Sequence, residues 1–125
     1  SHRLHAKQLT DEENKKVYGI CNNKNGHGHN YVINITLKGK ADPVTGMIIN
    51  LKELKHIINN EVIDKFDHKH LDLDCEEFKN IPSTIENIAI VIWNILEKKL
   101  NGLLYKIEAI ETENNSATYY GPEAN

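Results

Sequence analysis

The chain has 125 residues, of which 39% are hydrophobic and 26% charged, and a formal net charge of −3. This length suits one domain with a single core, and the composition excludes a disordered chain. No apolar run is long enough to cross a bilayer, and the scattered basic residues predict no nucleic-acid or membrane partner. The two cysteines, Cys21 and Cys75, provide neither a disulfide framework nor a thiolate zinc site, which favours a reducing, cytoplasmic location.

The first predicted element is a strand over residues 31–38. Its apolar and polar side chains alternate, as expected for a strand with one buried face. The side chains on the buried face are Tyr31, Ile33, Ile35 and Leu37. Turn residues follow at 41–47, including Pro43 and Gly46, and precede a short apolar run at 47–49. The sequence therefore predicts a hairpin.

Two amphipathic helices are predicted next. The first begins after Asn50, a preferred N-cap residue with Glu53 placed for a reciprocal cap, and ends near Asp67. Its apolar positions are Leu51, Leu54, Ile58, Val62 and Phe66. The second helix begins with a capping-box pattern at 83–86 and ends at Gly102. Its apolar positions are Ile85, Ile88, Ile92, Leu96 and Leu100. The segment 67–82 lacks periodicity and is predicted as a loop.

Two more strands complete the pattern. Tyr105, Ile107 and Ala109 alternate with polar residues, a turn is expected at 114–115, and 117–120 forms the returning strand. Helices with one apolar stripe each need an apolar sheet face to cover. The prediction is therefore a single α+β two-layer domain spanning 1–125, with a four-stranded antiparallel sheet and two helices packed on one face.

A pair of histidines, His27 and His29, precedes the first strand. Residues two apart in an extended chain point to the same face, so both imidazoles can bind one metal ion at the end of the core layer. Such pairs also arise by chance as surface or hydrogen-bonded histidines. A catalytic zinc usually has three protein ligands, and spacing does not choose the third ligand among the remaining histidines, which are His2, His5, His56, His68 and His70.

Four other residues carry candidate chemistry. A metal near Cys21 lowers the pKa of its thiol and makes it a usable base, although a lone cysteine is more often inert, as we expect for Cys75. Asp67 and His68 form either an oriented acid–base pair or a solvated surface. Glu111 continues the inward face of the third strand, so its carboxylate needs a partner: a lysine, or a ligand with two N–H donors.

Six stretches in sequence order resemble the 6-pyruvoyl-tetrahydropterin synthase family, especially its eukaryotic members. Together they span nearly the whole chain, which makes the resemblance more specific than any single motif. The stretches are Ser1–Leu4, Cys21–Tyr31, Asp42–Met47, Asp67–Asp72, Ser83–Asn87 and Glu111–Asn115.

The resemblance implies a tunnelling fold, assembled as a homohexamer (a dimer of trimers) with active sites at the subunit interfaces. It implies that zinc is bound by His2, His27 and His29. It also implies that Cys21 is the general base and that Asp67 and His68 complete a proton relay, with the cysteine and the Asp–His pair coming from neighbouring subunits.

For the substrate, the resemblance implies that Glu111 anchors the pterin ring and that Thr84 contacts it. Ile85 stands where many relatives have a second threonine, and His70 replaces a common asparagine.

The reaction that the resemblance implies converts 7,8-dihydroneopterin triphosphate into 6-pyruvoyl-tetrahydropterin with loss of triphosphate. The implied cofactor is Zn²⁺, with a further Mg²⁺ requirement left open, and no redox cofactor is needed. One alternative is a relative that releases a 6-carboxy- or 6-hydroxymethyl-pterin, although Cys21 argues against the hydroxymethyl branch. The other is a non-catalytic zinc-binding scaffold of the same fold.

Overall fold

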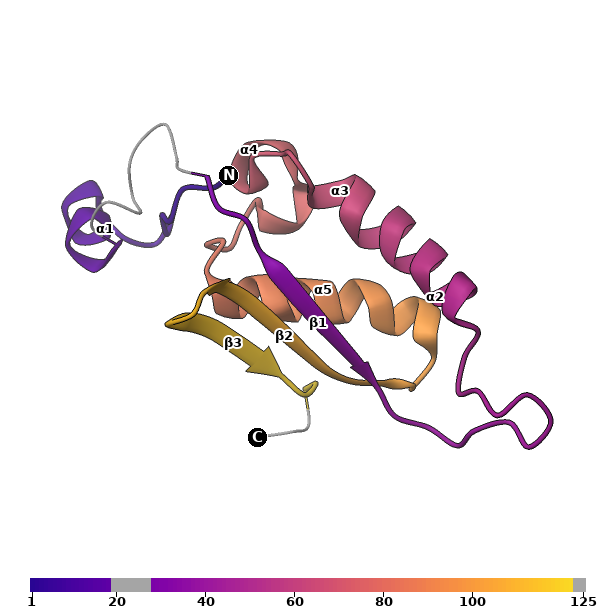
Figure 1. Ribbon diagram of the computed structural model, residues 1–125. Coiled ribbons are helices and arrows are strands. Elements are labelled where there is room, and N and C mark those ends of the chain that lie inside the picture. The colour runs from indigo at the N-terminus through magenta and orange to yellow at the C-terminus, as the bar shows by residue number, and fades with distance from the viewer. Residues whose placement is uncertain (19–27, 123–125) are drawn as a thin grey trace.

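The computed structural model describes residues 1–18 and 28–122, in which most helices form a layer on a small sheet and the N-terminal helix lies apart from it (Figure 1). In chain order the elements are α1 (Asp11–Tyr18), β1 (Val32–Leu37), α2 (Leu51–Ile58), a π-helical turn (Asn59–Ile63), α3 (Asp64–Phe66), α4 (Leu71–Asp74), a 3₁₀ turn (Glu76–Phe78), α5 (Ile85–Leu100), β2 (Leu104–Thr112) and β3 (Asn115–Tyr119). None of the helices in this part of the chain combines the length and apolarity that a membrane span requires.

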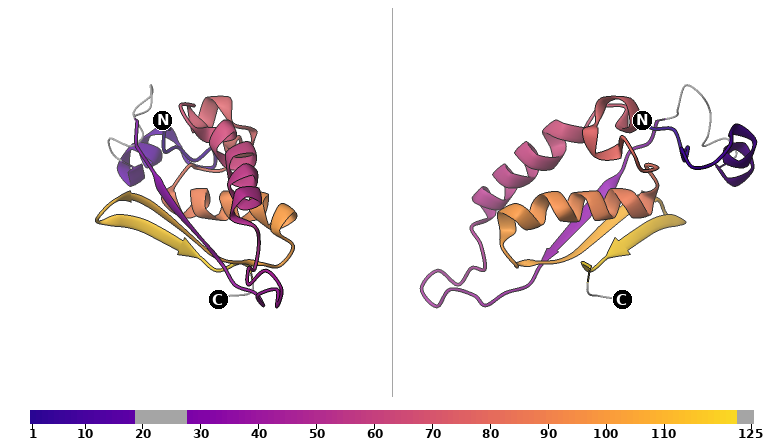
Figure 2. Two further views of the ribbon diagram at one scale, coloured as in Figure 1. Left: turned by 45° about the vertical axis from the view of Figure 1, so that its right-hand side comes forward. Right: turned by 180° about the vertical axis from the view of Figure 1, so that it is seen from behind.

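The sheet is antiparallel with strand order β1-β2-β3. Helix α5 packs on β2 and β3. The continuous helical segment from α2 through the π-helical turn to α3 lies on the same side of the sheet (Figures 1 and 2). The core lies between these layers and includes Leu96, Ile107 and Ala109, each with at most 1% of its surface exposed. This arrangement confirms the predicted α+β architecture with helices on one face.

The predicted fourth strand is wrong for the described residues, whose sheet has three strands. The expected turn does form, because the Asp42 carboxylate accepts the N–H groups of Val44 and Thr45, and Gly46 N–H donates to the Asp42 carbonyl at 2.7 Å. The apolar run after the turn has only three residues before Asn50 begins α2. It therefore joins the helix without pairing with β1.

The two predicted helices are confirmed. Asn50 Oδ1 accepts the Lys52 N–H at 2.9 Å, and the helical path from α2 through the π turn to α3 ends before Asp67. Thr84 Oγ1 accepts the Asn87 N–H at 3.2 Å, and every predicted apolar position of α5 is buried. Leu51 is the exception on the first helix, since it remains 66% exposed in the single chain.

Three short helical segments were not predicted. The segment 67–82 contains α4 and the 3₁₀ turn Glu76–Phe78. Helix α1 begins with a reciprocal cap, in which Glu13 N–H donates to Thr10 Oγ1 and Thr10 N–H donates to Glu13 Oε1. The Thr10 backbone N–H and the Thr10 side chain both favour the charged form of the Glu13 carboxyl, and they lower its pKa.

At the start of β2, the side chain that faces the core is not the one that the sequence predicted. A register shift opposite Thr36 and Leu37 pairs Leu37 with Leu104 while Thr36 pairs with Lys106. This bulge turns Leu104 into the core and leaves Tyr105 43% exposed on the opposite face, so the predicted inward position of Tyr105 is wrong. From Ile107 onward the alternation holds, and it carries Glu111 to the inner side of the sheet end.

Candidate metal centre

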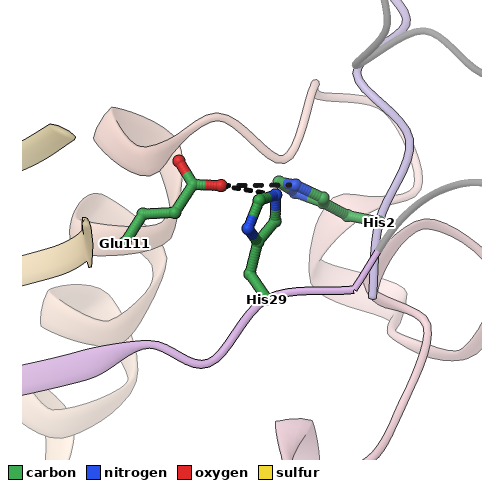
Figure 3. Close-up of side chains that lie close together, drawn as sticks. All are labelled: His2, His29 and Glu111. Atoms are coloured by element: carbon green, nitrogen blue, oxygen red, sulfur yellow. Dashed lines mark ion pairs between the residues drawn. The ribbon is translucent and has the colours of Figure 1, made fainter.

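The candidate site lies where three separate segments meet at one end of the sheet (Figure 3). His2 comes from the N-terminal segment, His29 from the stretch before β1, and Glu111 from the end of β2. Val32 pairs with Ile110, so this register brings the residues before β1 beside Glu111.

The N-terminal segment is held against the 70–72 stretch by backbone bonds. Leu71 N–H donates to the Ser1 carbonyl at 2.6 Å, and Arg3 N–H donates to the Asp72 carboxylate. His2 lies between the residues that make these two hydrogen bonds, and only 2% of its surface is exposed to solvent. Its placement therefore depends on contacts between residues about 70 positions apart in sequence.

The three side chains converge on a small volume. One possible ligand atom from each of His2, His29 and Glu111 lies within 4.8 Å of the others. The shortest approach is 2.6 Å between His29 Nε2 and Glu111 Oε1, and His2 Nε2 lies 4.0 Å from the same oxygen. The side chains of His29 and Glu111 are 24% and 11% exposed, so this charged group is largely shielded from solvent. Two imidazoles and a carboxylate in this arrangement suit a divalent metal.

The hydrogen bonding of His2 selects the tautomer that a metal ligand needs. Its Nδ1 lies 2.8 Å from the Ser83 carbonyl oxygen, which only accepts, so Nδ1 carries the proton and donates. Nε2 of the neutral ring then carries the lone pair, and it faces the Glu111 carboxylate. A backbone carbonyl on the second ring nitrogen is the usual support of a metal-binding histidine. The residues present therefore fit a zinc ion.

Glu111 has two partners within the chain. Oε1 pairs with His29, and Oε2 accepts from Asn115 Nδ2 across the β2–β3 turn. The sequence predicted an inward carboxylate that needs a partner, and the structure supplies a histidine and an amide for it. Sequence reasoning did not name Glu111 as a possible metal ligand, although its inward parity next to a histidine pair was the available signal.

A cavity of about 480 Å³ adjoins this cluster. Its lining includes Gly28, His29, Asp67 and His68, together with the apolar side chains of Ile33, Val62, Phe66, Phe78, Ile88 and Ile92. The cavity thus connects the candidate metal ligand His29 with the predicted acid–base pair within one chain.

Asp67 and His68 form a direct pair, with Nδ1 of the imidazole 3.0 Å from Oδ2 of the carboxylate. His68 has a positive φ of 59°, a left-handed backbone that lets the side chains of adjacent residues meet. The sequence left open whether these residues form an oriented pair or a solvated surface, and the structure shows them paired. His68 is 91% exposed, so the pair lies at the open rim of the cavity.

The two cysteines, His27 and Thr84 were also considered in the sequence, and they lie outside the candidate metal cluster or outside the described residues. Cys21 and His27 lie outside the described residues. Thr84 caps α5, and its oxygen accepts the Asn87 N–H. Cys75 is buried, and burial raises the pKa of its thiol, as expected for the inert cysteine.

Comparison with known proteins gives a consistent match over nearly the whole chain. A family model described as 6-pyruvoyl tetrahydropterin synthase matches residues 1–122. The chain belongs to the 6-pyruvoyl tetrahydropterin synthase family. This membership confirms the resemblance found in the motifs and the expectation of a lyase that acts in tetrahydrobiopterin biosynthesis.

Individual members of the family cover almost all of the chain. The 6-pyruvoyl tetrahydrobiopterin synthase of Homo sapiens is 49% identical over 97% of this chain and 84% of its own length. That of Drosophila melanogaster is 50% identical over 97% and 73%. The solved structure of Caenorhabditis elegans 6-pyruvoyl tetrahydropterin synthase superposes with a TM-score of 0.91 at 45% identity, covering 97% of this chain and 87% of that one.

Proposed function

We propose that this chain is a zinc-dependent enzyme that converts 7,8-dihydroneopterin triphosphate into 6-pyruvoyl tetrahydropterin with release of triphosphate. The observation that carries this proposal is the largely shielded cluster of His2, His29 and Glu111 beside a cavity of about 480 Å³. Family membership supplies the pterin chemistry, and the cluster supplies a place for the metal.

His2, His27 and His29 would hold the metal. When bound, zinc polarises the side-chain hydroxyls of the substrate and acidifies the neighbouring C–H groups. The Ser83 carbonyl keeps Nδ1 of His2 protonated, so its Nε2 lone pair needs no tautomer change before it binds.

Glu111 anchors the pterin ring. Its Oε1, which lies 2.6 Å from His29 Nε2, would accept an N–H donor of the ring when the substrate is bound. Asn115 keeps hold of Oε2 and so fixes the plane of the carboxylate. Thr84 uses its oxygen to cap α5, which leaves its O–H group able to donate to the ligand.

Proton transfer is assigned to Cys21, Asp67 and His68. Cys21 thiolate removes a proton from a side-chain carbon of the substrate and returns it at another position, which requires no external oxidant or reductant. Asp67 orients His68 through the 3.0 Å contact with Nδ1, so Nε2 is the atom that exchanges protons.

The assembly proposed here is a homohexamer, a dimer of trimers with active sites between subunits. The exposure of the Asp67–His68 pair at the cavity rim supports it, because a catalytic pair at an open edge can meet a cysteine from a neighbouring subunit. The proposal further includes one domain over 1–125, a cytoplasmic location and Mg²⁺ as a possible second requirement of the activity.

Two cysteine variants test this function. Cys21→Ala is expected to abolish turnover while retaining zinc, because the thiol acts as the base and not as a ligand. Cys75→Ala is the matched control, since that thiol is buried away from the cluster, and it is expected to retain turnover. Metal content and product formation are measured on both. Full activity of Cys21→Ala contradicts the base assignment, and an active metal-free His27→Ala contradicts the zinc mechanism.

A further inference from the structure

Tyr31, the residue that precedes β1, lies between the two described imidazoles of the cluster. Its ring centroid is 6.0 Å from that of His2 at an interplanar angle of 81°, and 5.8 Å from that of His29 at 56°. Its hydroxyl oxygen lies 3.2 Å from Nδ1 and 3.3 Å from Nε2 of His2. Tyr31 also lines the cavity beside the cluster.

The near-equal distances to both ring nitrogens show how the hydroxyl approaches His2. In the plane of the imidazole, a point this close to both nitrogens would collide with Cε1, which stands between them. The hydroxyl therefore lies off the plane, against the face of the ring. Metal ions and strong hydrogen-bond partners approach an imidazole nitrogen in the plane, along its lone pair or N–H direction. The Tyr31 contact is thus compatible with metal binding at Nε2.

Two contacts at different angles then define the orientation of the His2 ring. The Ser83 carbonyl holds Nδ1 in the plane at 2.8 Å, and the Tyr31 hydroxyl holds the ring from its face. A single hydrogen bond still permits the imidazole to rock about the bond to its Cβ, whereas a second contact out of the plane opposes that rotation. The metal-binding nitrogen is therefore kept directed at Glu111 and His29.

Packing alone does not account for a tyrosine at this position. The residues that share its face of the strand are Ile33, Ile35 and Leu37, and all of them pack against the core. A phenol at the end of such a face requires a polar partner for its hydroxyl, and the structure provides that partner in a buried histidine.

We propose that Tyr31 is a positioning residue, which orients His2 for metal binding and acts through that histidine rather than on the substrate. This inference rests on the proposed function, because it requires His2 to be a metal ligand. It adds a specific cause for the affinity of the site, namely that the His2 ring is oriented before the metal arrives.

Tyr31→Phe removes the hydroxyl and keeps the ring that packs with the core. Zinc affinity, measured by competition with a chromophoric chelator, is expected to fall about tenfold, the lower end of the usual effect of removing an outer partner of a ligand. The absorption spectrum of the Co²⁺-loaded protein is expected to shift, because the His2 ring tilts. The melting temperature of the metal-free protein is expected to match that of the wild type, since packing is retained.

Tyr105→Phe is the matched control, because this tyrosine lies on the opposite face of the sheet under Lys38 and is expected to leave zinc affinity unchanged. Wild-type zinc affinity and an unchanged Co²⁺ spectrum in Tyr31→Phe would overturn the positioning role alone. A Tyr31→Phe enzyme that binds zinc normally but has a raised KM would also overturn it, by showing a substrate contact. A wild-type chain that binds no zinc would overturn both this role and the proposed function.

Discussion

Substitution of Glu111 by glutamine separates the two roles that the structure allows for this carboxylate. Glu111 is proposed to anchor the pterin, yet its Oε1 lies among the candidate metal-binding atoms, 2.6 Å from His29 and 4.0 Å from His2. Glu111→Gln keeps the size of the side chain and one acceptor oxygen, but removes the charge and replaces the other oxygen with an amide donor.

The expected cost to folding is small. A hydrogen bond to a charged group contributes about 1.5–3 kcal/mol. His29 is about one quarter exposed and glutamine retains an acceptor, so we expect the metal-free protein to lose about 1 kcal/mol, or about 4 °C in Tm. The cost to substrate binding is larger, because an N–H donor of the pterin then faces an amide N–H. A lost bond of that kind contributes about 2–3 kcal/mol, which lowers kcat/KM by about 100-fold.

Zinc content, Tm and steady-state kinetics of Glu111→Gln are the three measurements. We expect zinc to remain at the wild-type stoichiometry, because the three imidazoles supply its ligands. Glu108→Gln is the control on the same strand, since Glu108 faces the other way and bonds Asn34 Nδ2 at 2.9 Å. Loss of zinc from Glu111→Gln would show that Glu111 is a metal ligand, and a wild-type kcat/KM would refute the pterin anchor.

Three other changes give independent tests. His68→Ala is expected to lower kcat by about 10²–10⁴-fold with a stability change below about 0.5 kcal/mol, because this side chain is 91% exposed; wild-type turnover would remove His68 from the relay. Leu96→Ala, at a fully buried position of α5, is expected to cost about 2–5 kcal/mol in urea unfolding, and a loss below about 1 kcal/mol would contradict the assigned core. Burial raises the pKa of Cys75, so its stabilising effect is full below the ordinary thiol pKa of about 8.5 and declines as pH rises above it. Cys75→Ala should therefore lose less stability than the wild type between pH 8 and pH 10, and equal losses would contradict this.

Periodicity predicted the parts of the fold that depend on local pattern. The apolar stripe of α5 and the alternation of β1 are both present, because one buried face imposes a fixed spacing on a helix or a strand. The prediction placed Tyr105 inward because alternation cannot show the bulge that turns Leu104 into the core. It added a fourth strand because three apolar residues were assigned to the sheet instead of to the entry of α2.

The candidate site was predictable only in part, because local spacing places His29 and Glu111 but not His2. Strand parity placed His29 and Glu111 at the inner end of the sheet, and the structure brings them to 2.6 Å. Nothing in spacing selects His2 over the other histidines, because its position depends on bonds from residues 1–3 to the 71–72 stretch. The family motifs supplied His2, and the structure places it in the cluster.

The most direct test of the proposed function is the identity of the product. The purified wild-type protein, loaded with zinc, is incubated with 7,8-dihydroneopterin triphosphate, and the pterin formed is identified by mass spectrometry. We predict 6-pyruvoyl tetrahydropterin together with an equal amount of free triphosphate. A 6-carboxy- or 6-hydroxymethyl-pterin, or unchanged substrate in the presence of bound zinc, would contradict the proposed reaction.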